Sequence, residues 1–120
     1  MCKYGRDKVK YWQWISGRQG SGYMIFYMWN FLFDCLIIRY PRGSYITPHV
    51  DPVTKGQHHR INIELTTPHL GGEFSCKLKH VLVKFPRFVW FRPDIGTHSV
   101  SEVIGSERWV LSFGWIWPFN

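Results

Sequence analysis

Short apolar runs separated by turn-forming residues dominate the hydrophobic pattern of this chain. The clearest alternation is at Arg60–Leu65, where Ile61, Ile63 and Leu65 share one face and Asn62 lies on the other. This two-residue period is that of a β-strand. Further strands are predicted at Tyr23–Phe33 with a break near Asn30, Cys35–Tyr40, Glu73–Leu78, Val81–Phe85, Phe88–Phe91, His98–Ile104 and Arg108–Trp115.

Few segments are left for helices or long loops. Thr54–His59 is predicted to be a polar loop, and at most a short helix is expected near Lys8–Ser16. Many short strands with turn residues between them predict an all-β fold with minimal helix, a barrel or jelly roll.

The predicted strand Arg108–Trp115 has two unlike faces. Trp109, Leu111, Phe113 and Trp115 share one face, and Arg108, Val110, Ser112 and Gly114 share the other. The first face is apolar and is expected to pack against something. The second carries a charge and a hydroxyl, and its small residues leave room for a ligand.

Length and composition bound the class of protein. The 120 residues predict a single domain, with 1–35 as an N-terminal cover segment and 36–117 as the β-core. The most apolar stretch, Tyr23–Ile38, is short for a membrane span and contains Asn30 and Asp34. Three cysteines without C-x-x-C spacing favour reduced thiols, and with no signal peptide the expected location is the cytoplasm.

The formal net charge of +7 leaves two interpretations of the N-terminal segment. Its basic residues are interleaved with Tyr4, Tyr11, Trp12 and Trp14. Such a mixture binds phosphates and stacks bases in nucleic-acid proteins, but its aromatic residues equally cover the core of a small domain, which we favour. The many aromatic residues also make a homodimer an expected partner state.

Candidate metal ligands are His49, Asp51 and His98. The segment Tyr40–Asp51 (YPRGSYITPHVD) ends in an H-x-D pair, whose members project to the same side of a strand. His98 follows the segment FRPDIGT, in which Asp94 is interpreted as a turn former. Two histidines and one carboxylate are the ligand set of facial-triad iron(II) sites. The alternatives are a surface turn at Pro48–Pro52 and a core or capping role for His98.

The other histidines are less informative. His58 and His59 are adjacent in the predicted loop and are expected to be exposed, although either one near the entrance would line the path of a substrate. His69 and His80 are isolated, and no role is assigned to them.

The order His49-x-Asp51, then His98, then Arg108 resembles the 2-oxoglutarate/iron(II) oxygenases, as do Gly71–Phe74 and the FRPD lead-in. The resemblance implies a double-stranded β-helix with iron(II) held by His49, Asp51 and His98. It implies that Arg108 and Tyr40 bind the distal carboxylate of 2-oxoglutarate. Ser112 lies four residues after Arg108, whereas the serine of relatives lies two after, so its role as a further contact is open. Asn62 is expected to point into the cavity, and Arg60 on the same side competes with Arg108 as the anchor.

The activity implied by the resemblance is a hydroxylation that consumes 2-oxoglutarate and O2. A protein side chain such as proline is the first substrate expectation, and a nucleobase is the second. No acid, base or nucleophile from the protein is needed, since iron and co-substrate supply the chemistry. Two other classes stay open: a cupin-like metalloenzyme that does not use 2-oxoglutarate, and a non-catalytic β-barrel binding module.

Overall fold

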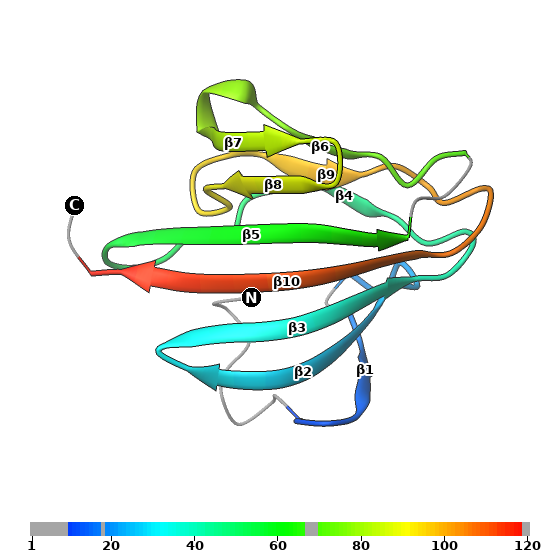
Figure 1. Ribbon diagram of the computed structural model, residues 1–120, viewed down its shortest axis with the longest axis horizontal. Helices are drawn as coiled ribbons and strands as arrows, with labels where there is room; N and C mark the ends of the chain where they lie inside the picture. The colour runs from blue at the N-terminus through cyan, green and yellow to red at the C-terminus, as the bar shows by residue number, and fades with distance from the viewer. Residues whose placement is uncertain (1–9, 18, 67–69, 119–120) are drawn as a thin grey trace.

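The computed structural model describes residues 10–17, 19–66 and 70–118, which form ten β-strands in two antiparallel sheets (Figure 1). The strands are β1 (Trp14–Ser16), β2 (Met24–Phe31), β3 (Phe33–Tyr40), β4 (Ile46–His49), β5 (Gln57–Thr66), β6 (Phe74–Cys76), β7 (Val81–Phe85), β8 (Phe88–Phe91), β9 (His98–Val100) and β10 (Arg108–Trp117). A 3-10 turn, Leu78–His80, precedes β7. The described residues contain no α-helix, and none of their helical segments is long and apolar enough to cross a membrane.

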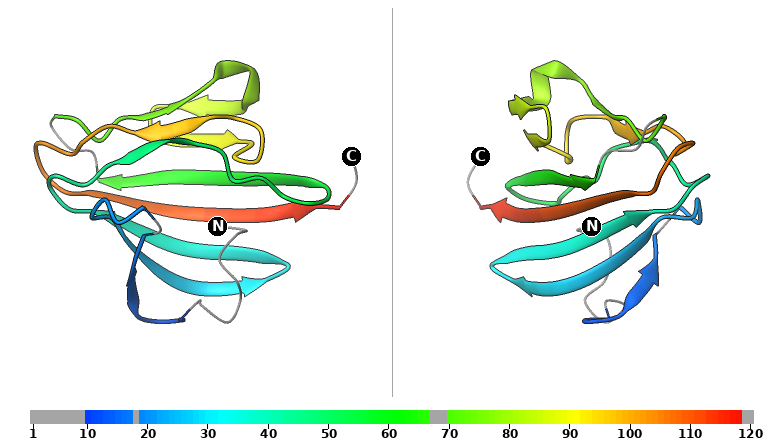
Figure 2. Two further views of the ribbon diagram at one scale, coloured as in Figure 1. Left: turned by 180° about the vertical axis from the view of Figure 1, so that it is seen from behind. Right: turned by 45° about the vertical axis from the view of Figure 1, so that its right-hand side comes forward.

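The larger sheet has seven strands in the order β1-β2-β3-β10-β5-β8-β7, and the smaller has three in the order β4-β9-β6. Figure 2 shows the smaller sheet lying across one face of the larger one. The all-β jelly-roll prediction is therefore confirmed.

The core lies between the two sheets. Side chains from β2, β3 and β10 fill it, among them Ile25, Leu36 and Val110, each without measurable exposure. On β10 the residues Arg108, Val110, Ser112 and Gly114 face this interior, whereas Trp109, Leu111, Phe113 and Trp115 lie on the outside of the larger sheet and are half-buried. The polar, small-residue face of this strand is thus the inner one.

Several predicted element bounds were wrong. Trp14–Ser16 is a strand rather than part of a helix, while Lys8 and Val9 lie outside the described residues. The segment Tyr23–Phe33 is not one strand, because the chain reverses at Leu32, whose φ of 67° is left-handed, and β2 and β3 form a hairpin.

Other strands also differ in length from the prediction. β5 begins at Gln57 within the predicted loop, because its first residues pair with Trp115–Trp117 at the end of β10. β9 ends at Val100 instead of Ile104, and β6 is confined to Phe74–Cys76.

Candidate metal centre

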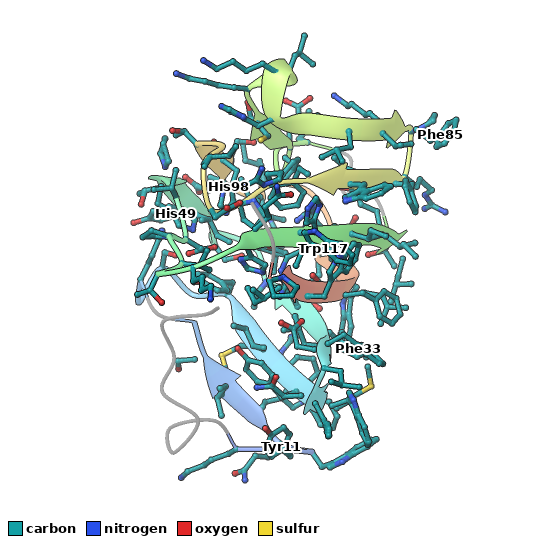
Figure 3. All side chains as sticks on the ribbon, turned by 90° about the vertical axis from the view of Figure 1, so that its left-hand side faces the viewer. Tyr11, Phe33, His49, Phe85, His98 and Trp117 are labelled. Carbon is teal, nitrogen blue, oxygen red and sulfur yellow. The ribbon has the colours of Figure 1, made fainter. Side chains whose placement is uncertain are left out.

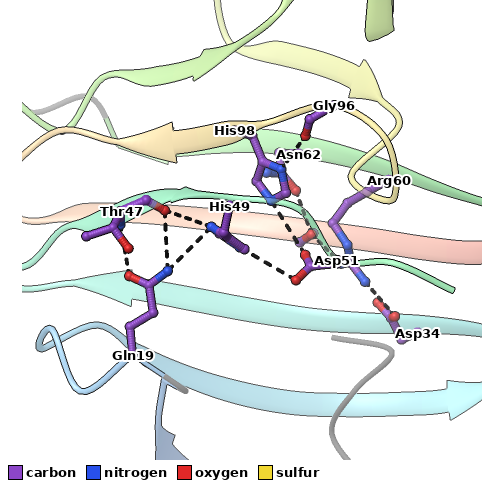
Figure 4. A network of polar contacts seen from close by, with 10 residues as sticks. Gln19, Asp34, Thr47, His49, Asp51, Arg60, Asn62, Gly96 and His98 are labelled. Carbon is purple, nitrogen blue, oxygen red and sulfur yellow. Dashed lines mark hydrogen bonds and ion pairs between the residues drawn. The ribbon is translucent and has the colours of Figure 1, made fainter.

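His49, Asp51 and His98 meet at one end of the space between the sheets (Figure 4). His49 ends β4 and His98 begins β9, and the two are direct partners in the register of the smaller sheet. Asp51 follows β4, and its backbone N–H donates to the carbonyl of Pro93 at 2.7 Å. The segment that carries His49 and Asp51 and the turn that leads to His98 are thereby brought together, although they are more than forty residues apart in the chain.

The ligand atoms of the three side chains converge. Asp51 Oδ1 lies 3.6 Å from His49 Nε2, and Asp51 Oδ2 lies 3.5 Å from His98 Nε2. All three candidate ligand atoms are within 4.8 Å of one another. Figure 3 shows His49 and His98 side by side near one edge of the molecule.

The opposite nitrogen of each imidazole is held by the backbone. Nδ1 of His49 lies 2.8 Å from the carbonyl oxygen of Thr47, and Nδ1 of His98 lies 2.9 Å from that of Gly96. Because a carbonyl accepts and never donates, each Nδ1 carries a proton in these contacts, so Nε2 is the ring nitrogen available to a metal. Outer hydrogen bonds of this kind orient metal-binding histidines. Two imidazole nitrogens and one carboxylate fit a divalent transition metal.

Burial of the triad is uneven. Asp51 and His98 are buried, whereas His49 is half-buried and marks the open side of the group. The adjoining cavity is mostly apolar, with a few polar side chains. It is lined by Tyr23, Ile38, Tyr40, Ile46, His49, Asp51, Arg60, Asn62, Phe74, Phe91, His98 and Val100.

A buried charged network lies on the far side of this cavity. Arg60 Nη2 donates to Asp34 Oδ2 and Arg60 Nη1 donates to Ser112 Oγ, both at 2.6 Å. The hydroxyl of Ser112 in turn donates to Asn62 Oδ1. Burial disfavours the charged form of Arg60, but the Asp34 carboxylate outweighs this effect and raises the pKa of the guanidinium. Arg60 is consequently a fixed cation with its own counter-ion.

Gly114 leaves space for that guanidinium. A Cβ at this position would lie 2.2 Å from Arg60 Nη2 and 3.0 Å from Asp34 Oδ2. We expect Gly114→Ala to lower the free energy of unfolding by about 2 kcal/mol through overpacking, as measured by urea denaturation. Since the steric effect acts on the Arg60–Asp34 pair, its cost should shrink when Asp34→Asn is already present. Full additivity of the two changes would contradict this explanation.

Arg108 lies apart from His49, Asp51 and His98, on the other side of Asn62 and Phe74. Its side chain is 1% exposed, its Nε donates to Glu64 Oε1 at 2.9 Å, and its guanidinium lies over the ring of Tyr40 at 4.7 Å. Its Nη1 is buried without a hydrogen-bond partner among the described residues. Burial raises the pKa of Tyr40, against the opposing influence of Arg108.

A second cavity adjoins Arg108. It is lined by Asn62, Glu64, Glu73, Phe74, Lys84, Phe85, Pro86, Arg87, Phe88, Val89 and Arg108. Asn62 and Phe74 line both cavities. Tyr40 lines the first cavity, and its ring also packs against Arg108 at the second. Tyr40 therefore lies between the candidate metal ligands and Arg108.

The sequence-predicted site residues divide into two groups. His49, Asp51, His98, Tyr40 and Asn62 line the metal cavity, as does the competing residue Arg60. Ser112 and Arg108 do not line it: Ser112 is buried behind Arg60, and Arg108 faces the second cavity. Asp94 lies in the turn before His98, as predicted, and is ion-paired with Arg92.

The prediction that His58 and His59 are exposed was wrong. Both belong to β5, with His58 1% and His59 9% exposed. The extension of β5 along β10 places both histidines in the sheet. The polar, glycine-containing sequence of this segment does not predict such an extension. Sequence reasoning also missed Asp34 and Glu64 as the carboxylate partners of the two arginines. For Asp34 the available signal was a lone carboxylate within the apolar stretch Tyr23–Ile38.

The buried His58 is expected to make the folded protein less stable in acid. Burial, followed by the nearby Arg60, lowers its pKa from 6.5 to about 3. Between these values the unfolded chain binds a proton that the folded chain excludes, so stability should fall as the pH drops below 6.5, by about 1.4 kcal/mol per pH unit from this group. Urea denaturation of metal-free wild type and His58→Gln between pH 7 and pH 5 measures the difference. Equal pH slopes in the two proteins would contradict the prediction.

No family model and no curated protein matches the chain. Among solved structures it is similar to KdgF from Halomonas sp., with a TM-score of 0.51 and 15% sequence identity over 90% of this chain and 87% of that chain. At this identity the likeness shows the fold alone. It supports the jelly-roll fold, here with a His-Asp-His group that could hold a metal ion.

Proposed function

We propose that this protein is an iron(II)-dependent enzyme that uses 2-oxoglutarate and O2 to hydroxylate its substrate. The observation that carries the proposal is the convergence of His49, Asp51 and His98, with each Nδ1 held by a backbone carbonyl. Bound iron would supply the activation of oxygen, with 2-oxoglutarate as the source of the remaining electrons.

The residues around His49, Asp51 and His98 would bind and orient the substrate and exclude water from the cavity. Phe74, Phe91 and Val100 make the cavity wall apolar, which strengthens polar interactions inside it. Asn62 is held by Ser112, so its side chain is fixed toward the cavity. His49, as the most exposed ligand, marks the side from which substrate approaches.

Arg108 and Tyr40 support 2-oxoglutarate as the co-substrate. The buried Nη1 of Arg108 has no partner among the described residues, and an unsatisfied buried donor is costly unless a ligand completes it. A carboxylate is the natural acceptor for a guanidinium. The shared position of Tyr40 connects this donor to the metal cavity.

A second candidate function is a metalloenzyme of the cupin type that does not use 2-oxoglutarate. The observation favouring it is that both arginines of the interior already have carboxylate partners, Arg60 with Asp34 and Arg108 with Glu64. In this candidate both pairs are structural, and the metal acts directly on the substrate.

The substrate of the proposed hydroxylase is a protein side chain such as proline, with a nucleobase as the second proposal. The support for the first is the resemblance of the site residues to the oxygenase family, and for the second it is the basic and aromatic N-terminal segment. Salt-dependent binding to single-stranded DNA separates them, since absence of binding at moderate salt would remove the nucleobase.

An anaerobic titration of 2-oxoglutarate into iron(II)-loaded protein tests the proposed function. We expect a visible metal-to-ligand charge-transfer band that saturates with 2-oxoglutarate and is not produced by succinate. Folded, iron-loaded protein that shows no band would overturn the use of 2-oxoglutarate and leave the cupin-type candidate. Protein that binds no divalent metal would overturn both.

A further inference from the structure

The outer face of the larger sheet is a continuous apolar surface. One register row crosses all seven strands and takes one side chain from each: Trp14, Phe26, Ile37, Leu111, Ile63, Phe88 and Phe85. Partners in register point to the same side of a sheet. Every member of the row is aromatic or branched aliphatic, so the pattern does not depend on one strand.

Neighbouring rows continue the surface in both directions along the strands. One consists of Cys35, Phe113, Ile61, Trp90 and Val83, and another contains Phe33, Trp115 and His59. Apart from His59, which is 9% exposed, their side chains are only partly covered, and that of Phe33 is 45% exposed. In Figure 3 the labelled Phe33 and Phe85 lie on the opposite side of the molecule from His49 and His98.

The face is nearly free of unpaired charge, although the chain has a net charge of +7. A further row contains Met24, Arg39 and Trp109, and Arg39 is the charged side chain among the described strand residues of this face; it is paired with Glu107 at 2.6 Å and lies near Trp109. His59 is neutral, because Trp90 Nε1 donates to its Nδ1 at 3.0 Å while its Nε2 contacts Gln57 Oε1. Burial also lowers the pKa of His59.

The size of the face suits a protein interface. At about 4.8 Å between strands and about 3.4 Å per residue, six residues from each of β2, β3, β10 and β5, with the 3 of β1, the 4 of β8 and the 5 of β7, give roughly 600 Å² of flat area. Protruding aromatic side chains raise the accessible area above this value, toward the ~800 Å² per partner of a stable complex. Apolar patches on monomers are commonly about 300–600 Å² at most.

We propose that two copies of this chain dimerise through the outer faces of their larger sheets. A flat, uncharged sheet face is self-complementary, since two such faces pack directly on each other as in a β-sandwich. The central strand β10 is the fourth of seven, so a two-fold axis near Leu111 and Phe113 buries the apolar rows of both copies symmetrically. Charges elsewhere on the two copies then remain in solvent.

The dimer is independent of the metal site, which opens on the other side of the molecule. A second copy is favoured over a different partner, because a second copy necessarily presents the same flat apolar sheet face.

The test is the molar mass of full-length protein by analytical ultracentrifugation at about 10 µM, where a dimer with submicromolar Kd is nearly complete. We expect a dimer for the wild type and a monomer for Leu111→Lys. Ile104→Lys adds the same charge at an exposed site outside the rows and should remain dimeric. Ile63→Lys repeats the test from β5 if Leu111→Lys does not fold, with the far-ultraviolet circular dichroism spectrum as the check of folding.

Two results would overturn the proposal. One is a monomeric wild type at this concentration, which would assign the face to a different partner. The other is a dimer that persists in folded Leu111→Lys or folded Ile63→Lys, which would place the interface elsewhere.

Discussion

His98→Ala is expected to abolish specific metal binding while leaving the fold intact. His98 lies 3.5 Å from Asp51 and supplies one of the three converging ligand atoms. In wild-type protein a divalent metal at a hundred times its Kd should add about 2.7 kcal/mol to the free energy of unfolding. Thermal unfolding with and without iron(II) or cobalt(II) measures this gain, which should correspond to a shift on the order of 10 °C in Tm.

The matched control is His80→Ala, which removes a histidine outside the triad. This variant should keep the full metal-dependent rise in Tm, whereas His98→Ala should lose it. A rise of equal size in all three proteins would mean that the metal binds elsewhere. No rise in the wild type would favour a non-catalytic β-barrel binding module.

Arg108→Gln is expected to raise the 2-oxoglutarate concentration needed for half-saturation by about one to two orders of magnitude. The buried guanidinium has a free Nη1, and loss of hydrogen bonds to a charged group costs about 1.5–3 kcal/mol. The measurement is the anaerobic charge-transfer titration with iron(II)-loaded protein. The iron affinity itself should change little, since Arg108 does not line the metal cavity.

Glu64→Gln is the paired variant, and it should act in the opposite direction. Glu64 accepts from Arg108 Nε at 2.9 Å and competes with any incoming carboxylate. Neutralising it removes this competitor and should tighten 2-oxoglutarate binding. If Arg108→Gln and wild type saturate alike, Arg108 is not the anchor, and Arg60 takes its place.

The balance between the two candidate functions depends on the internal ion pairs. Arg60 is held by Asp34 and Ser112 with both terminal nitrogens engaged, so it is the weaker candidate for an incoming carboxylate. Arg108 has one engaged nitrogen and one buried donor without a partner among the described residues. This difference is why Arg108 remains the proposed anchor although it faces the second cavity.

The sequence predicted the fold class because the evidence for strands is local. Alternation at Arg60–Leu65 and the two unlike faces of Arg108–Trp115 depend on a period of two residues that any strand imposes. The grouping of His49, Asp51 and His98 was also predictable, from an H-x-D spacing and the order of motifs. Which face of β10 is inward was not, because Trp109, Leu111, Phe113 and Trp115 have the composition of a core.

Tertiary structure alone decided the remaining features, since each depends on contacts between distant segments. The pairing of β5 with the end of β10 turned a predicted loop into a strand and buried His58 and His59. The approach of β3 to β10 placed Asp34 against Arg60 over Gly114. The sequence by itself determined an all-β chain, because strands follow from short-range spacing, and a candidate iron ligand set, because the order of the motifs along the chain indicates it. The counter-ions of its arginines and its outward apolar face followed only from strand register, which no local pattern encodes.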